Sequence, residues 1–255
     1  MIRVIVAGGC GRMAGEVARL VSEAEDMELV GIAERADHPE IGKSRYGVDI
    51  TAELASLLEK ADVVVEFTSP EGLLEILEGM KGSSISLVSG TTGLSDAEFD
   101  RLKESAEERA ILWAPNMSTG VNLMFKLAAE VTRALPDYDV EIVEMHHRHK
   151  KDAPSGTAKK LAEIVKDNRK ITKTIYGREG HTGERAPDEL AVLALRGGDV
   201  AGEHTLYFAT EGERLELVHR ASSRLAFAKG TLKAIRFIAH KPKRFYQFAD
   251  ILEDK

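Results

Sequence analysis

Short apolar runs and amphipathic stretches alternate through the first 115 residues. The apolar runs occupy residues 2–8, 27–34, 61–67, 84–90 and 110–115. Runs of this length suit β-strands that are buried on both faces. Between them, apolar residues at helical spacing predict helices, as at 70–80 and 95–110. Strands that alternate with helices through short connections predict a parallel, doubly wound sheet, an α/β fold of the Rossmann type.

The pattern changes from Ser118 onward. A long amphipathic helix is predicted over 118–135, a half-exposed strand over 138–147 and a second helix over 157–168. Three further strand-like runs follow, at 189–198, 203–210 and 213–221. Because glycine-bearing turns separate these runs, we expect them to be antiparallel neighbours. The region predicts a second domain of α+β class, built on one open mixed sheet.

The last helical pattern, at 224–240, predicts that the chain returns to the first domain. We therefore expect a dinucleotide-binding domain formed by residues 1–117 and 228–255. Residues 118–227 are expected to form a domain for substrate binding and oligomerisation. A broad single sheet needs its second face covered, and self-association would cover it, so a homo-oligomer is predicted.

Composition and charge narrow the class of protein. The 255 residues are 43% hydrophobic and 30% charged, as in ordinary soluble globular proteins. The 35 basic and 42 acidic side chains give a net charge of −7, which argues against a nucleic-acid partner. One cysteine excludes an intramolecular disulfide and a zinc site built on cysteines. The first apolar run is too short for a signal peptide and no apolar run reaches eighteen residues, so a cytoplasmic protein without membrane contact is expected.

A glycine-rich turn joins the first predicted strand to the first predicted helix. Gly8, Gly11 and Ala14 have the spacing at which small residues let the backbone approach a pyrophosphate. Glu34 ends the second predicted strand, where the acid that binds the adenosine ribose is expected, and Arg35 follows it. A carboxylate suits NAD and a guanidinium suits the 2′-phosphate of NADP, so use of either cofactor is predicted. An exposed Glu-Arg pair without a ligand is the alternative.

Loops rich in small hydrogen-bonding residues follow the later strands. They span 67–72, 89–93 and 114–120, at the carboxyl edge of the predicted sheet, where ligands of such sheets bind. Three such loops at one edge favour a cofactor rim over three ordinary turns. Cys10 lies inside the glycine turn, but no base stands near it in the sequence. A structural role for this cysteine is therefore favoured over a nucleophilic one.

A cationic cluster ends the strand predicted at 138–147. Residues 146–151 contain three histidines and two lysines, and residues 154–157, Pro-Ser-Gly-Thr, then lead into a helix. The N–H groups of a first helical turn, with hydroxyls beside them, favour a carboxylate-binding site there. Lysine and histidine next to such a site can hold a second carboxylate and donate a proton.

Two alternatives stay open for this cluster. One is a zinc site formed by His147, His149 and Asp152, since His146 and His147 of a strand point to opposite faces and cannot easily share one ion. The other is an exposed polar loop without a ligand. The concentration of imidazole and ammonium groups beside a helix start favours the anion site over both.

This cluster and seven further motifs resemble the 4-hydroxy-tetrahydrodipicolinate reductase (dihydrodipicolinate reductase) family of diaminopimelate and lysine biosynthesis. In chain order they are GGCGRMAGE, EFTSPEG, SGTTG, APNMSTGVNL, EMHHRHKKDAPSGTA, GREGHTGER, LRGGDVAGEHT and HRASSRLAFAKG. Long motifs in this order are specific, and they extend over nearly the whole chain. The resemblance implies a two-domain homotetramer that reduces a cyclic, unsaturated dicarboxylate, 4-hydroxy-tetrahydrodipicolinate, with NADH or NADPH.

The resemblance also implies roles for individual residues, and no metal ligand. His146 matches the family's proton donor or acceptor, and Lys150 matches its proton donor. The substrate carboxylates are held at the positions that match His147, Lys150, Ser155, Gly156 and Thr157. The cofactor is held at the positions that match Gly8, Gly9, Cys10, Gly11, Arg12, Met13, Glu34, Arg35, Gly90, Thr91, Thr92, Ala114, Pro115, Asn116 and Met117.

The chain departs from the family pattern at three positions outside the catalytic motif. Met117 stands where phenylalanine is usual, Ser69 replaces a basic residue found in some members, and Ala14 replaces the third glycine of the turn. Two other functions stay open: a non-catalytic NAD(P)-binding sensor, and a related reductase for a different imine or keto acid. The His-Lys loop argues against the sensor, which has no need of a positioned acid.

Overall fold

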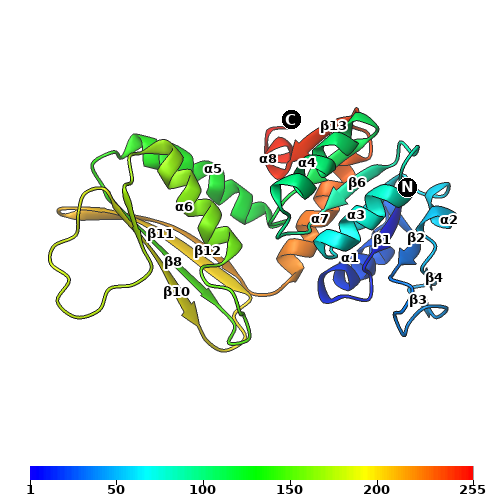
Figure 1. Ribbon diagram of the computed structural model, residues 1–255, viewed down its shortest axis with the longest axis horizontal. Coiled ribbons are helices and arrows are strands. Elements are labelled where there is room, and N and C mark those ends of the chain that lie inside the picture. Colours follow the sequence, from blue (N-terminus) through cyan, green and yellow to red (C-terminus); the bar gives the residue numbers. More distant parts are fainter. Residues whose placement is uncertain (255) are drawn as a thin grey trace. The chain divides into compact units, whose positions relative to one another are not determined.

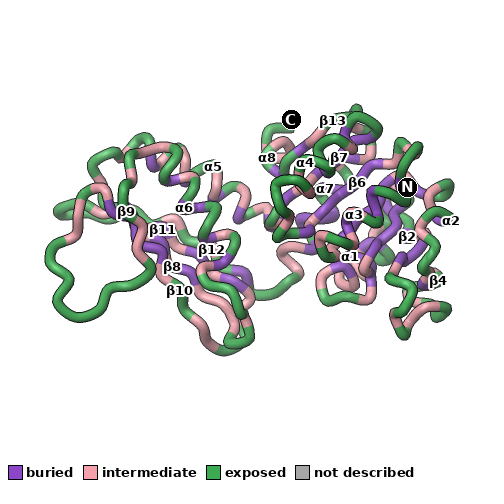
Figure 2. Tube along the Cα trace, in the orientation of Figure 1, coloured by how far each residue is buried: buried purple, intermediate pink, exposed green. Residues whose placement is uncertain are grey.

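The computed structural model describes residues 1–254, and contacts within the chain divide it into two units (Figure 1). The first unit runs from Met1 to Thr119 and includes the C-terminal segment from Leu225 onward. The second runs from Gly120 to Arg224. Each unit has its own buried core, which follows the strands of its sheet (Figure 2). The cofactor and substrate roles expected for the two parts of the chain stay predictions.

An eight-stranded sheet forms the centre of the first unit. Its order is β13-β7-β6-β5-β1-β2-β4-β3, and every neighbouring pair is parallel except β3 and β4. From β1 the chain builds outward to β2 on one side and to β5 on the other, so the switch point of a doubly wound sheet lies beside β1. The strands are β1 (Ile2–Ala7), β2 (Met27–Ala33), β3 (Ser44–Arg45), β4 (Val48–Thr51), β5 (Val63–Glu66), β6 (Ser86–Ser89), β7 (Ala110–Trp113) and β13 (Arg244–Gln247).

Helices cover both faces of this sheet, because successive residues of a strand point to opposite sides. Val4 and Val6 of β1 share a core with α1, α7 and α8, whereas Ile5 and Ala7 share a second core with α2, α3 and α4. Alternate residues of this one short strand therefore pack into two separate cores, one on each face of the sheet. The helices are α1 (Arg12–Glu23), α2 (Leu54–Leu58), α3 (Pro70–Gly79), α4 (Asp96–Glu104), α7 (Leu225–Ile238) and α8 (Phe248–Glu253), with a 3-10 turn η1 (Ser105–Glu107).

Helix α7 approaches the segment after β7 so closely that only glycine fits at the contact. A Cβ atom at Gly230 would lie 1.7 Å from the carbonyl oxygen of Met117. Met117 is itself buried in the core that α7 shares with α1. The glycine that closes the motif at 219–230 therefore allows two backbones to pack directly against each other.

The second unit is a five-stranded mixed sheet with helices on one face. Its order is β12-β11-β8-β10-β9, and its core combines buried residues of these strands with Met124 of α5 and Leu161 of α6. The strands are β8 (Asp139–His146), β9 (Lys173–Ile175), β10 (Glu189–Arg196), β11 (Gly202–Thr210) and β12 (Glu213–Ala221), and the helices are α5 (Thr119–Ala134) and α6 (Gly156–Asn168). No helix in the described part of the chain is both long and apolar enough to cross a membrane.

The loop between β9 and β10 is fastened to the sheet by arginines. Arg178 donates to both carboxylate oxygens of Glu141 on β8 (2.9 Å each), and Nε of Arg185 donates to one of the same oxygens (2.9 Å). Arg185 also bonds to the carbonyl oxygen of Glu189 on β10 (2.5 Å). Both arginines belong to the motif GREGHTGER, which therefore has a structural role in holding this loop.

The predicted fold class is confirmed, with two corrections in detail. The run at 189–198 is not an antiparallel neighbour of the run at 203–210, because β10 lies beside β8 in parallel and β8 separates it from β11. The reason is the crossover through α6, which carries the chain from the carboxyl end of β8 back to the edge of the sheet at which β8 begins. The helix expected at 95–110 ends early, at Glu104, because β7 begins at Ala110. The short elements α2, β3, β4, β9, β13 and α8 were not predicted.

Candidate active site

The glycine turn after β1 packs tightly between two neighbouring strands. Gly8 has a φ of +70°, and its N–H donates to the carbonyl oxygen of Ala33 at the end of β2 (2.8 Å). A Cβ at Gly9 would lie 2.6 Å from the side chain of Ile32. Gly11 is the N-cap of α1, and within residues 1–254 no side chain caps the N–H groups of its first turn. The turn therefore presents backbone N–H groups as binding of a pyrophosphate requires.

Glu34 follows β2 and lies over this turn. One of its carboxylate oxygens accepts from the N–H of Cys10 and the other from the N–H of Arg35, both at 3.2 Å. The guanidinium of Arg35 is exposed and pairs with Asp37 (3.1 Å). The structure thus brings the predicted ribose-binding acid to the predicted phosphate loop, with a cation beside it.

A buried carboxylate joins the rim loops that follow β5 and β6. Glu66 is fully buried at the end of β5 and accepts from the hydroxyl of Thr91 (2.6 Å) and from the hydroxyl of Ser89. It also accepts from the N–H (2.9 Å) and the hydroxyl (2.8 Å) of Thr68. Sequence reasoning did not single out Glu66, although an acidic residue that ends an apolar strand run is a signal that could have found it.

The other predicted cofactor residues lie along the same edge but differ in exposure. Gly90 must be glycine, because a Cβ there would lie 2.1 Å from the ring of Phe67. Thr91 is buried with its hydroxyl on Glu66, so its side chain supports the loop. Buried members of the set are Ala114 and Met117, half-buried members are Met13 and Asn116, and exposed members are Arg12, Thr92 and Pro115. Their contacts with a cofactor stay predictions.

In the second unit, His146 ends β8 beside a buried carboxylate. Its Nδ1 lies 2.6 Å from Oε2 of Glu144, which is fully buried two residues earlier on the same face of the strand. Because an ionised carboxylate can only accept a hydrogen bond, Nδ1 carries the proton of that bond. Nε2 is then the ring nitrogen available for proton exchange. A Cβ at Gly202 would lie 3.0 Å from this Nε2, so glycine at the start of β11 makes room for the ring.

Glu144 also fixes Arg196 and the start of α6. Arg196 is the register partner of His146 and donates two bonds, each 2.9 Å, to the two oxygens of Glu144. The N–H of Ser155 donates to Oε1 (3.0 Å), and Arg196 donates to the carbonyl oxygen of Asp152 (2.7 Å). Burial alone would raise the pKa of Glu144, but the hydrogen bonds from His146 and Arg196 outweigh it and lower the pKa to about 2. Glu144 is therefore an anion at neutral pH.

Ser155 caps α6 from inside the protein. Its Oγ accepts from the N–H of Ala158 (3.2 Å) and lies 3.0 Å from Nε2 of the buried His204. Burial, assisted by the charge of His146, lowers the pKa of His204 to about 3, so this ring is neutral and shares a hydrogen bond with the hydroxyl through Nε2. The Ser155 hydroxyl, which was predicted to hold the substrate, is therefore already hydrogen-bonded within the protein. Gly156 is exposed, and Thr157 is half-buried.

Lys150 and His147 form the turn after β8. The N–H of Lys150 donates to the carbonyl oxygen of His147 (3.1 Å), and the Lys150 ammonium donates to the carboxylate of Asp152 (2.8 Å). Burial opposes ionisation of Asp152, but the bond from Lys150 outweighs it and lowers the pKa of the carboxyl group. Burial, followed by the charge of Arg224, lowers the pKa of His147. The turn therefore presents a neutral imidazole and an ammonium group.

The zinc alternative for this cluster has no converged set of ligands in residues 1–254. The ring centroids of His147 and His149 lie 6.2 Å apart, and Asp152 is bonded to Lys150. The three potential ligands that do converge are in the first unit: Cys10, Glu34 and His38.

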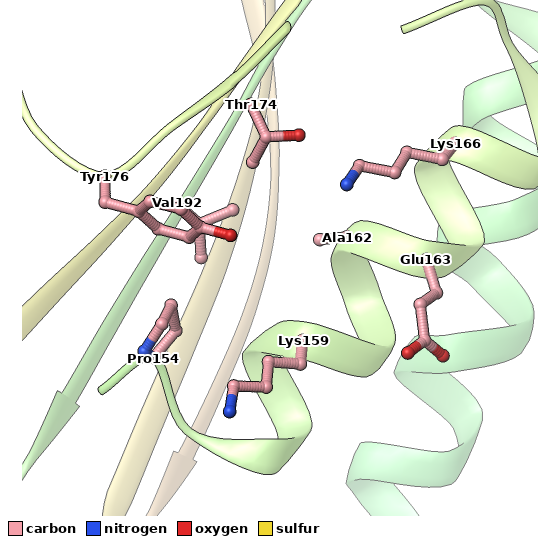
Figure 3. A pocket seen from close by; sticks show the side chains of 8 residues that line it. All are labelled: Pro154, Lys159, Ala162, Glu163, Lys166, Thr174, Tyr176 and Val192. Carbon is pink, nitrogen blue, oxygen red and sulfur yellow. The ribbon is translucent and has the colours of Figure 1, made fainter. Parts of the chain in front are cut away.

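A cavity of about 200 Å³ opens beside α6, but it does not contain the predicted catalytic groups. Figure 3 shows side chains of α6 on one wall and side chains of β9 and β10 on the other. The amino groups of Lys159 and Lys166 extend toward the space between the walls. The lining residues are Pro154, Lys159, Ala162, Glu163, Lys166, Thr174, Tyr176 and Val192. The cavity is thus a gap between helix and sheet, separate from His146 and Lys150.

Two family models match the chain almost end to end. "Dihydrodipicolinate reductase, N-terminus" matches residues 2–117, and "Dihydrodipicolinate reductase, C-terminus" matches residues 120–252. The chain belongs to the dihydrodipicolinate reductase family. This membership confirms the resemblance that the motifs carry, and the two matched segments meet where the chain passes from the first unit to the second.

Proteins named 4-hydroxy-tetrahydrodipicolinate reductase are similar to this chain over nearly its full length. A 4-hydroxy-tetrahydrodipicolinate reductase of Nitrosomonas eutropha is 43% identical over 265 residues, with 99% of this chain and 98% of the relative covered. The enzyme of that name from Methanothermobacter thermautotrophicus is 44% identical over 271 residues, with 99% of each covered. The solved structure of a dipicolinate-bound dihydrodipicolinate reductase from Paenisporosarcina sp. TG-14 has a TM-score of 0.80 at 28% identity and covers 97% of both chains.

Within this family motif, sequence reasoning found the histidines and the lysine but missed the residues that position them. Glu144 had a local signal, since its spacing of two from His146 places both on one face of a strand. Arg196 and His204 had none, because 52 and 49 residues separate them from the partners they bind. Only the pairing of β10 and β11 with β8 brings them to the site.

The Glu144→Gln variant should be less stable than the wild type in a pH-dependent way. The folded-state pKa is lowered from 4.5 to about 2, so the ionised carboxylate contributes on the order of 3 kcal/mol above pH 5. This contribution falls as the pH drops below 4.5 and is lost at about pH 2. Urea unfolding should show the full gap at pH 7 and a smaller one at pH 3.

The control for this experiment is Glu163→Gln, an exposed carboxylate on α6, which should change stability by less than about 0.5 kcal/mol. A stability gap for Glu144→Gln that is equal at pH 7 and pH 3 would show that the buried charge is not its source.

Proposed function

We propose that the chain reduces 4-hydroxy-tetrahydrodipicolinate to tetrahydrodipicolinate with NADH or NADPH, a step of diaminopimelate and lysine biosynthesis. The observation that carries the proposal is the buried Glu144, which holds His146, Arg196 and the start of α6 in one site. Family membership of both halves of the chain supports it. So does the solved relative, which binds dipicolinate, a ring with two carboxylates.

The first unit suits a dinucleotide. Gly8 and Gly9 leave no room for side chains, the first turn of α1 has a glycine N-cap, and Glu34 lies over the turn. We infer that the pyrophosphate binds beside the glycine turn at the N–H groups of the first turn of α1, and that the carboxylate of Glu34 binds the adenosine ribose. When bound, the reduced nicotinamide supplies the hydride.

The second unit would hold the two carboxylates of the substrate. The backbone N–H groups of Gly156 and Thr157, with the hydroxyl of Thr157, at the start of α6, suit one carboxylate, because a helix N-terminus favours anions. The imidazole of His147 and the ammonium of Lys150 suit the other. In this proposal Ser155 acts by capping α6, since its hydroxyl is bonded inside the fold.

Reduction of the substrate also needs a proton donor. We assign this role to Lys150 and propose His146 as a second group that can act as an acid or a base. The Lys150 side chain is 21% exposed and its ammonium is held by Asp152, so it can turn one N–H toward a ligand. His146 is held at Nδ1 by an anionic carboxylate, so its Nε2 can take up and release a proton as an acid or a base. We propose that turnover requires no metal ion.

The Lys150→Ala variant should lose both binding and proton transfer. We expect kcat to fall about 10²–10⁴-fold, as for a removed general acid, and KM to rise. His146→Ala should lower kcat chiefly. The measurement is a coupled assay with enzymatically generated 4-hydroxy-tetrahydrodipicolinate, run with both cofactors in the presence of a chelator.

Lys151→Ala is the matched control, because Lys151 is an exposed lysine next in the chain. It should leave kcat and KM near the wild-type values. Wild-type kinetics for Lys150→Ala would refute the catalytic assignment. Cofactor binding without any turnover of this substrate by the wild type would refute the proposed function and favour a sensor or another reductase.

The Arg35→Ala variant should separate the two cofactors. Hydrogen bonds to a charged group contribute about 1.5–3 kcal/mol, so loss of a guanidinium at the 2′-phosphate should weaken NADPH binding about 10–100-fold. NADH binding should stay nearly unchanged, and the wild type should use both cofactors within about tenfold. Calorimetric titration measures both affinities, with Arg101→Ala on α4 as an exposed control. Equal losses for NADH and NADPH would place Arg35 away from the 2′-phosphate.

We further propose that the second unit assembles the chain into a homotetramer. A row of residues crosses the face of its sheet opposite the helices: Val218, Thr205, Val143 and Leu193 are neighbours in register on β12, β11, β8 and β10. The adjacent row, Leu217, Leu206, Ile142 and Val192, packs in the core under the helices. Val218 is 42% exposed. A second apolar row of this kind suits burial against another copy of the chain.

Val218→Glu should therefore weaken assembly, because it places a charge in the proposed interface. Light scattering should give the wild type a mass that is a multiple of 27.9 kDa and the variant a smaller one. Val218→Thr, which keeps the branched shape without the charge, should assemble. A wild type with the mass of one chain would contradict the assembly.

The remaining partners follow from the same function. We propose a cytoplasmic enzyme whose partners are a small dicarboxylate, a nicotinamide cofactor and its own copies. The single cysteine fits a reducing compartment. The net charge of −7 favours neither nucleic acid nor an anionic membrane surface as a partner.

A further inference from the structure

Three potential metal ligands from two segments of the chain meet beside the glycine turn. Cys10 lies in the turn after β1, Glu34 follows β2, and His38 lies four residues further on. One ligand atom of each lies within 4.8 Å of the other two, and all three residues are half-buried. The proximity of Cys10 and Glu34 is enforced by the bond from the Cys10 N–H to Glu34 Oε2.

These atoms are the ones that zinc prefers: a sulfur, an imidazole nitrogen and a carboxylate oxygen. Bonds of about 2.0–2.3 Å in tetrahedral geometry put two ligands of one zinc ion roughly 3.3–3.8 Å apart. Separations up to 4.8 Å thus close by rotation of side chains that are not buried. Three protein ligands leave a fourth position for water, which is the arrangement of an open, exchangeable site.

Each ligand has the bonding capacity that coordination needs. Glu34 accepts two backbone N–H bonds, at 3.2 Å each, which leaves lone pairs on its carboxylate. The ring of His38 is oriented by the N–H of Glu40, which donates to Nδ1 (3.2 Å), and coordination would replace this one long bond. A thiolate and a carboxylate together would neutralise a divalent ion.

We propose that Cys10, Glu34 and His38 form a site for a thiophilic divalent cation of the Zn²⁺ type, and that this cation and the dinucleotide exclude each other. The exclusion rests on the proposed function, in which Glu34 binds the adenosine ribose and the turn containing Cys10 binds the pyrophosphate. A cation held by the same carboxylate occupies that space. The site would thus act as an inhibitory one, not as a cofactor site.

The cation must displace the proton of the thiol. Burial raises the pKa of the Cys10 thiol, the charge of Arg45 opposes this, and the carboxylates of Glu34 and Glu40 add to it. Binding should therefore release the thiol proton.

The test uses the full chain and two probes, Cd²⁺ and Zn²⁺, without substrate. Cd²⁺ should bind one ion per chain and produce the ultraviolet charge-transfer band of a cadmium–thiolate bond, and Zn²⁺ should displace it. Cys10→Ser should abolish the band. His38→Ala should lower the affinity at least tenfold, whereas His181→Ala, which removes an exposed histidine of the second unit, should not change it.

The second part of the test measures whether NADH and the cation compete for the site. Saturating NADH should remove the band, and Zn²⁺ should inhibit the reductase competitively with NADH. Because His38 has no assigned role in cofactor binding, His38→Ala should keep the NADH affinity and resist the inhibition.

Absence of the band, or a band that persists in Cys10→Ser, would overturn the site. A band that saturating NADH leaves unchanged, in a chain shown by titration to bind NADH, would overturn the exclusion. Failure of the reductase assay with cadmium binding intact would instead refute the proposed function alone.

Discussion

The buried carboxylate of Glu144 is the interaction on which the second unit depends. An anion removed from water is costly unless hydrogen bonds replace its hydration. Glu144 gains them from His146, from two N–H groups of Arg196 and from the backbone of Ser155. These partners come from β8, from β10 and from the start of α6. The requirement to satisfy one charge therefore fixes the relative positions of the imidazole, the guanidinium and the helix that the proposed chemistry uses.

The first unit also contains a buried carboxylate whose hydration is replaced by hydrogen bonds from nearby loops. Glu66 is fully buried at the end of β5 and accepts from Ser89, Thr91 and Thr68 on the rim loops. Loops that carry polar backbone at the edge of a sheet need internal partners, and one carboxylate supplies four lone-pair sites at once. In both units a saturated carboxylate at a strand end holds the loops that are proposed to bind ligands.

The number of hydrogen bonds that a carboxylate accepts within the protein distinguishes structural carboxylates from those that can still bind a ligand. Glu144 and Glu66 each accept four hydrogen bonds within the fold, so their capacity is filled. Glu34 accepts two, both long and both from backbone, and is half-buried. It has capacity left for the ribose of a dinucleotide or for a cation. The proposed competition between these two ligands follows from this difference.

By itself, the sequence determined the fold class, the order of the long helices and strands, and the family. It could do so because buried parallel strands, amphipathic helices and the glycine turn are local patterns, with periods of two and of about 3.6 residues. It also predicted a site at His146, Lys150 and the start of α6, because these groups belong to one continuous motif. Tertiary structure alone decided which strands are neighbours: β10 lies beside β8 and not beside β11, because the crossover through α6 sets its direction.

Tertiary structure also decided what holds the site in place. Arg196 and His204 reach it across separations of about fifty residues, and the hydroxyl of Ser155 lies inside the protein, 3.0 Å from Nε2 of His204. The convergence of Cys10, Glu34 and His38 likewise follows from the pairing of β1 with β2. Hydrogen bonds and metal ligands depend on distances in space, and a sequence pattern determines such distances only within one helix or strand.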